Sequence, residues 1–326
     1  MLWIHGGGFQ AGTKDSYNSS SLADSVGAIV VTINYRLTAF EIVASAVMFS
    51  GSVLVDLDYV RDPLSGLAAA DGFVVDHDHL KDIPVRALQQ TLDSGYTGPN
   101  IVTSYLREDA ALTLTLAIPD LLDPTKPLTM DVVRNIVAKN LLPRDGNPQC
   151  AVPDYGLADR VMQHYNLSAT ESRGDTLLKL YHLGTESVQA FPAFKEASIY
   201  ANHIKPMPSL PSVQLIRTIY DSHYNGLHAF HAMELPYIFG PWLLLPNQTY
   251  DPRLTVSYRD MLHQVTHNGG SMIGPQFLQD NHYGYNEVGL DAQWSPGTSD
   301  LEAVYQYWQQ IANEPCPCGS HAMYAY

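Results

Sequence analysis

The chain has 326 residues, enough for one large domain or two ordinary ones, and an apolar share of 45% that can fill a core. Its 18 Lys and Arg residues against 33 Asp and Glu residues give a formal net charge of −15, which argues against nucleic acid and anionic membrane surfaces as partners. No apolar run approaches the roughly 18 residues of a membrane span. The first residues have neither a basic start nor a long apolar stretch, so we expect no transmembrane segment and no signal peptide in this chain.

Short apolar runs that read as buried strands recur along the chain, at 1–4, 27–35, 44–52, 100–106 and 213–221. Between and after them lie helix-like stretches, for instance 83–93, 129–141 and 300–312. Strands that alternate with helices indicate an α/β fold with a mostly parallel sheet.

Residues 121–210 are rich in Pro and amphipathic pieces and show no clear strand. We interpret them as a helical insertion over the C-terminal edge of the sheet, where α/β enzymes keep their binding clefts. The chain then reads as a single domain over 1–326, with a partial sheet core at 1–120, the insertion at 121–210 and a C-terminal part at 211–326. Beyond about residue 265 the periodicity is weak, and 300–312 is the clearest element there.

The run His5-Gly6-Gly7-Gly8-Phe9 directly follows the first strand. Consecutive glycines let backbone N–H groups turn toward a cleft without obstruction by side chains, which suits the stabilisation of an oxyanion. This loop type is found in lipases and esterases of the α/β-hydrolase kind. The alternative is a plain flexible turn.

Longer stretches carry a more specific resemblance. LWIHGGGFQAG and GAIVVTINYRL resemble the type-B carboxylesterase/lipase family, which includes the cholinesterases and the fungal lipases. Further matches follow in the family's order: ASAVMFSGS, AADGFVVDHDHLKDIPVRALQQTLDSG, IVTSYLREDAALTL and GLHAFHAMELPYIFG. The resemblance covers most of residues 1–245. It implies an α/β-hydrolase fold, hydrolysis of a carboxylic ester (small-molecule or lipid) by the full-length relative, and no cofactor.

Carried over residue by residue, the resemblance places the oxyanion amides on Gly7 and Gly8 and the catalytic acid on Asp109. The family usually has Glu followed by Gly at the acid, so Asp109 and Ala110 are departures. Glu108 is the alternative acid if the alignment slips by one. A shorter Asp still suits the role, because orienting an imidazole needs a hydrogen-bonded carboxylate and no particular chain length.

The general base falls on His231 within Ala229-Phe230-His231-Ala232-Met233-Glu234. Histidine suits a base because its pKa lies near neutrality. His223 and His228 lie close in sequence, but the flanking MELPYIFG selects His231. Glu234 is expected to be a structural carboxylate or one that supports the site.

The nucleophile of such an enzyme is a Ser in a G-x-S-x-G elbow, and this sequence contains no such motif. The strand ending in NYRL reaches the SGS strand across Thr38–Val43 only, whereas the βαβ unit that embeds the elbow needs about 30 residues. Ser45 and Ser50 lie on a run that reads as a buried strand and are not expected to substitute. We therefore predict that the chain as written is inactive, missing both the elbow and the family's N-terminal part. The alternative is a non-catalytic, cholinesterase-like binding protein.

Three glycosylation sequons begin at Asn18, Asn166 and Asn247 and suggest that the full-length relative is a secreted glycoprotein. The three cysteines, Cys150, Cys316 and Cys318, form an odd set that suggests a lost partner. A metal site at the C-terminal Cys-Pro-Cys run is disfavoured because it lacks a second ligand cluster at zinc spacing. A metal site at residues 76–79 (DHDH) is disfavoured because the resemblance makes this stretch the loop after Asp71-Gly72. We expect no metal and no cofactor.

Overall fold

The structure is a computed structural model. It describes residues 1–7, 12–34, 45–49, 60–61, 73–74, 90, 93, 100–142, 153–203, 213–222, 224–268, 274–275, 277–279, 282–297 and 301–314. The main sheet has five strands in the order β11-β10-β7-β6-β3. Their bounds are Ser45–Phe49 for β3, Asn100–Leu106 for β6, Val213–Thr218 for β7, Asn286–Val288 for β10 and Trp294–Pro296 for β11. All neighbours pair in parallel except β11, which is antiparallel to β10.

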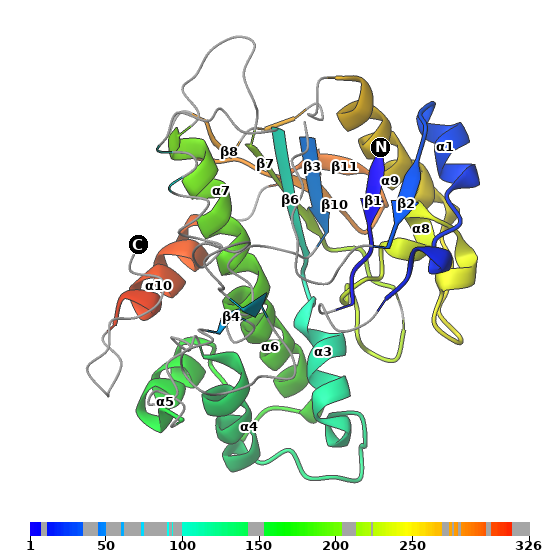
Figure 1. Ribbon diagram of the computed structural model, residues 1–326. Coiled ribbons are helices and arrows are strands. Elements are labelled where there is room, and N and C mark those ends of the chain that lie inside the picture. The colour runs from blue at the N-terminus through cyan, green and yellow to red at the C-terminus, as the bar shows by residue number, and fades with distance from the viewer. Residues whose placement is uncertain are drawn as a thin grey trace.

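Strands β1 (Leu2–Ile4) and β2 (Val31–Ile33) form a separate parallel pair. Figure 1 shows β1 on the side of β3, with β2 beyond it, and both run in the same sense as β6. Side chains connect this pair to the main sheet. The ring centroid of Trp3 lies 6.3 Å from the ring centroid of Phe49 on β3 and 4.6 Å from that of Phe239. The minor strands are β4 (Val60–Arg61) with β5 (Phe73–Val74), and β8 (Phe277–Gln279) with β9 (His282–Tyr283).

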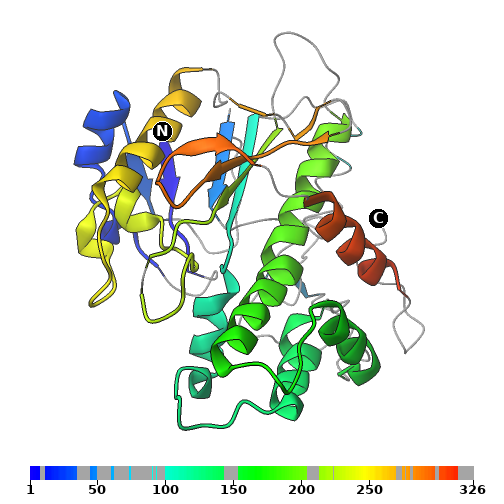
Figure 2. The same ribbon diagram turned by 180° about the vertical axis from the view of Figure 1, so that it is seen from behind.

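Helices of the middle of the chain lie beyond the C-terminal ends of the strands, at the lower end of Figures 1 and 2. They are α3 (Ala110–Ala117), α4 (Met130–Ile136), α5 (Tyr155–His164) and α6 (Arg173–Thr185), with a short 3-10 turn at Pro119–Leu121. Two further 3-10 turns, Lys14–Ser16 and Pro241–Leu243, lie elsewhere, next to β2 and α8. Two π-helical stretches, Val137–Leu141 and Glu186–Ala190, continue α4 and α6. Helix α7 (Phe191–His203) then returns along the sheet to the start of β7 (Figure 1).

Both faces of the main sheet are covered, so its central strands are buried almost throughout. On β6, Val102 and Leu106 join one core, while Tyr105 joins a second core on the opposite face. The first core includes α1 (Ser20–Val26) and α9 (Pro252–His267), which lie side by side in Figure 2. The second lies under α7 and α10 (Leu301–Asn313). The remaining helix is α8 (Leu235–Ile238).

The arrangement is that of an α/β-hydrolase fold, and the strands expected near residues 1–4, 44–52, 100–106 and 213–221 are present. The strand expected over 27–35 begins only at Val31. Gly27 instead ends α1 in the left-handed conformation, with φ of 66°. The tail holds more structure than predicted, because β10 and β11 extend the main sheet. The helix predicted over 83–93 lies outside the described residues, apart from Gln90 and Asp93.

Within the described part of the chain, no helix combines the length and the apolar character that crossing a membrane requires.

Candidate functional site

Asp109 lies just beyond β6, at the C-terminal edge of the sheet. Its own N–H donates to the carbonyl of Leu106 at 3.1 Å, and its Oδ2 accepts from the N–H of Leu106 at 3.0 Å. This reciprocal turn holds the carboxylate against the end of the strand. The residue is fully buried, and helix α3 begins at the next position. A short side chain on such a turn has little freedom, so its second oxygen has a fixed direction.

That second oxygen contacts His231. The His231 Nδ1 and the Asp109 Oδ1 lie 2.7 Å apart, and because an ionised carboxylate can only accept, the imidazole donates. The His231 side chain is 36% exposed while that of Asp109 is fully buried, so one side of the ring meets the carboxylate and part of the ring meets solvent. Within the described residues, Nε2 has no hydrogen-bond partner. A base oriented by an acid in this way presents Nε2 toward a reacting group.

The loop that carries His231 has an unusual backbone. Asn225, His228 and Ala232 all have positive φ, at 46°, 55° and 65°, the last directly after His231. For a residue with a Cβ this conformation costs roughly 1–2 kcal/mol, and such outliers gather at functional sites. Ser222 secures the loop: its N–H and its hydroxyl both donate to the carbonyl of His228, at 3.3 and 2.6 Å.

The charge state of His231 follows from its surroundings. Burial alone lowers the pKa of this imidazole, but the charge and the hydrogen bond of Asp109, with a further contribution from Glu234, outweigh burial and raise it to about 9. The raised pKa favours the protonated form of this imidazole, whereas a general base must be neutral to accept a proton.

Glu234, three residues after His231, is 2% exposed, and its Oε2 has no partner within the described part of the chain. Burial and the nearby charge of Asp109 raise the pKa of its carboxyl to about 7, against the opposing effect of His231. A supporting role of Glu234 stays a prediction; its unpaired, buried oxygen makes the ionised form of the carboxyl unfavourable.

Glu108, the alternative acid, contacts a different histidine. Its Oε1 lies 2.7 Å from Nε2 of His182 on α6 and also accepts from Arg107. Its Oε2 accepts the N–H of Ala229 at 3.1 Å. Of the two adjacent acids, Asp109 is therefore the one hydrogen-bonded to His231. No local sequence pattern pointed to His182, because 74 residues separate it from Glu108.

The glycine loop is described only as far as Gly7, and Gly8 lies outside the described residues. Gly7 is exposed and has φ of 134°, a conformation that a side chain rarely permits. The loop is tightly closed at its base: a Cβ on Gly12, with φ of 114°, would lie 2.4 Å from both the Gly6 carbonyl oxygen and Nδ1 of buried His5. Both glycines are thus required by the path of the backbone.

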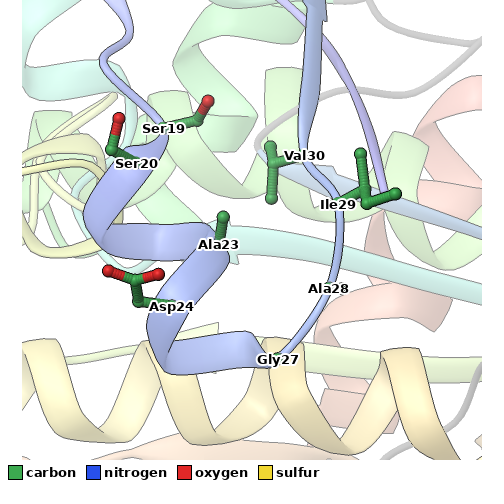
Figure 3. A pocket seen from close by; sticks show the side chains of 8 residues that line it. All are labelled: Ser19, Ser20, Ala23, Asp24, Gly27, Ala28, Ile29 and Val30. Carbon is green, nitrogen blue, oxygen red and sulfur yellow. The ribbon is translucent and has the colours of Figure 1, made fainter.

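Several other candidates lie apart from this pair or outside the described part of the chain. A shallow surface depression between α1 and the chain leading into β2 contains none of the site residues (Figure 3); it is lined by Ser19, Ser20, Ala23, Asp24, Gly27, Ala28, Ile29 and Val30. Side-chain placement of Ser45 is not described, and Ser50, the three cysteines and residues 76–79 lie outside the described residues. Among the described residues, no three His, Cys, Asp or Glu side chains form a group that could hold a metal ion. All three sequon asparagines are exposed.

Comparisons with known proteins agree with this fold. Residues 1–46 match the model of the carboxylesterase family. Acetylcholinesterase-1 of Trittame loki is 50% identical over 42 residues, 12% of this chain and 8% of that protein. Probable N-octanoylanthranilate hydrolase AqdA2 of Rhodococcus erythropolis is 27% identical over 121 residues, 35% of this chain and 23% of that protein. The matches thus span less than a quarter of either relative.

Among solved structures, the carboxylesterase Est55 of Geobacillus stearothermophilus superposes with a TM-score of 0.64 and 15% identity, over 94% of this chain and 81% of that one. At this identity the likeness concerns the fold. Residues 1–46 thus resemble the carboxylesterase family and the cholinesterases in sequence, and the whole chain resembles a carboxylesterase in fold. These likenesses together support a type-B carboxylesterase-like family with an α/β-hydrolase fold.

Proposed function

We propose that this protein carries the acid–base half of a carboxylic ester hydrolase. In this proposal Asp109 orients His231, His231 is the general base, and the amides of Gly7 and Gly8 form the oxyanion hole. The observation that carries it is the 2.7 Å hydrogen bond between His231 and the fully buried carboxylate of Asp109 at the C-terminal edge of the sheet. The substrate class is a carboxylic ester of a small molecule or a lipid.

We further propose that the chain as written does not hydrolyse esters by the serine mechanism. Its sequence has no G-x-S-x-G motif to supply the nucleophile. Without a nucleophile for His231 to deprotonate, only a small residual rate enhancement from substrate binding and the oxyanion hole would remain.

The exposed asparagines at positions 18, 166 and 247 support a related proposal, that the whole protein is a secreted glycoprotein.

The test measures turnover of p-nitrophenyl acetate and butyrate by the purified chain, with His231→Ala and Asp109→Asn as matched variants. We expect all three rates to equal the rate of buffer alone. Turnover that His231→Ala abolishes would contradict the proposed inactivity while supporting the role of His231. Turnover that persists in both variants would contradict the acid–base assignment.

A gain-of-function arm tests the assignment directly. The block of the Rhodococcus hydrolase that corresponds to the strand, elbow and following helix is inserted between Phe40 and Ala44. We expect ester hydrolysis to appear in this chimera and to fall by 10²-fold or more, on the order of loss of general-base catalysis, when His231 is changed to Ala. Binding of an ester that stabilises the unmodified chain without turnover would instead favour a non-catalytic binding protein.

A further inference from the structure

Glu108 lies at the meeting point of three segments near the candidate site. Its main chain is at the end of β6, and its side chain reaches helix α6 through His182 and the His231 loop through Ala229. The residue is fully buried, and both carboxylate oxygens have partners. A buried carboxylate with every oxygen engaged holds its neighbours at fixed distances, since each lost bond leaves an uncompensated charge.

The contact with the loop runs in both directions. The N–H of Glu108 donates to the carbonyl of Ala229 at 3.1 Å, and the N–H of Ala229 donates to Oε2 of Glu108 at 3.1 Å. Ala229 is two residues before His231, so this pair of bonds fixes the backbone of the loop just before the imidazole. Asp109 is the next residue after Glu108. The two adjacent acids therefore fix, respectively, the backbone and the imidazole of one short segment.

The far side of Glu108 is also anchored. His182 donates to Oε1 from α6, and Arg107 donates to the same oxygen. The side chains of His182 and Arg107 are each 34% exposed, so they reach from the surface to a carboxylate that solvent does not. Charge-assisted hydrogen bonds of this kind are stronger than neutral ones. They restrict the rotamer of Glu108 and hence the place of its bond to Ala229.

We propose that Glu108 is a positioning residue for the acid–base pair: by fixing the Ala229 backbone, and being fixed in turn by His182, it sets the geometry of the His231–Asp109 hydrogen bond. This inference rests on the proposed roles of Asp109 and His231. It also gives the helical insertion a part in the site, because His182 reaches the loop through Glu108.

The experiment follows the titration of His231 by NMR of the ring protons, assigned with a His231→Gln variant among the 13 histidines. It compares Glu108→Gln and Glu108→Ala. Both remove the charge, but Gln retains an acceptor for the Ala229 N–H and Ala does not. If Glu108 acts by position, the His231 pKa falls by about one unit or more in Glu108→Ala and by clearly less in Glu108→Gln, since separation from Asp109 removes the main charge that raises it. Equal pKa values in the two variants, or no fall in either, would overturn the proposal.

His182→Leu provides a second arm, which remains available if Glu108→Ala does not fold. Removal of a basic side chain cannot lower a neighbour's pKa through charge alone, whereas a loosened Glu108 lowers it. We therefore expect a small fall in the His231 pKa, and an unchanged or raised value would contradict the proposal. Glu287→Gln is the matched control, a mostly buried carboxylate that bonds Arg217 on another part of the sheet and should leave His231 unchanged.

No substrate enters this experiment. A failed esterase assay would therefore leave it intact, and an unchanged titration would leave the esterase proposal intact.

Discussion

His231 and Asp109, 122 residues apart in the chain, form a 2.7 Å hydrogen bond in which one partner is wholly buried and the other partly exposed. The bond ties the loop after β7 to the end of β6. Because the folded state holds the His231 proton more tightly than the unfolded state does, the pair also links folding to pH.

The first prediction concerns this linkage. The pKa of His231 is raised from 6.5 to about 9 in the folded state, so the pair stabilises the protein fully below pH 6.5 and the contribution disappears as pH rises through 9. Asp109→Asn should flatten the fall in unfolding free energy across that window. The ring is more than a third exposed, so after allowance for solvent screening we expect about 1 kcal/mol. Urea unfolding at pH 6, 7.5 and 9 measures the free energy of unfolding of both proteins. The same change of this free energy with pH in both proteins would contradict the prediction.

The second prediction concerns Glu234. The pKa of this carboxyl is raised from 4.5 to about 7, so the folded state binds an extra proton between these values and stability declines as pH rises through the window. Glu234→Gln cannot ionise and should lose this decline. The difference in unfolding free energy between the variant and the wild type should therefore rise by about 3 kcal/mol, in favour of the variant, from pH 4.5 to pH 8. Urea unfolding at both pH values checks it. The exposed Glu302→Gln serves as the control and should keep the wild-type slope.

The third prediction uses two glycines of α6 as a matched pair. A Cβ on Gly184 would lie 2.9 Å from the Cβ of Ala110, whereas a Cβ on exposed Gly174 would meet nothing nearer than 3.9 Å, the Oγ of Ser172. Gly184→Ala should therefore destabilise the fold by about 1–3 kcal/mol through overpacking. Gly174→Ala should stabilise it by a few tenths to about 1 kcal/mol through helix propensity. Thermal or urea unfolding measures both variants. A Gly184→Ala variant as stable as the wild type would contradict the predicted overpacking, and a destabilised Gly174→Ala would contradict the propensity effect.

The fourth prediction concerns the sequons. Expressed through a eukaryotic secretory pathway, the chain should carry glycans on its three exposed asparagines and show a mobility ladder that a glycosidase collapses. Asn166 and Asn247 both have positive φ, 50° and 69°, which asparagine tolerates better than most residues, so the sites are better removed at the hydroxyl position. Ser168→Ala and Thr249→Ala should each remove one step. A single band unaffected by the enzyme would contradict the proposal.

The sequence predicts the centre of the fold well because strands buried on both faces carry an unbroken apolar run, as β6 and β7 do. Prediction from the sequence fails where an element forms because of its pairing with strands distant in the chain. Strand β10 reads Asn-Glu-Val, without apolar periodicity, and exists because its backbone bonds to β7 and β11. The same limit applies to the site. The family resemblance predicted both Asp109 and His231 as site residues, but no local sequence pattern predicts the contact of Glu108 with His182 on a distant helix.

The pairing of β1 with β2 has a consequence for how the protein opens. Within the described residues these strands share backbone hydrogen bonds only with one another, and a two-stranded unit is marginal on its own. Its contacts with the rest of the fold are made by side chains, among them the indole of Trp3, which packs against Tyr17, Phe49 and Phe239. The unit should therefore open before the rest of the sheet, with amide protons at residues 31–33 exchanging faster than those at 101–106. Residues 5–7, which follow β1 directly, would lose their anchor in the same event, so the first part of the fold to open would be the one that carries the proposed oxyanion amide of Gly7.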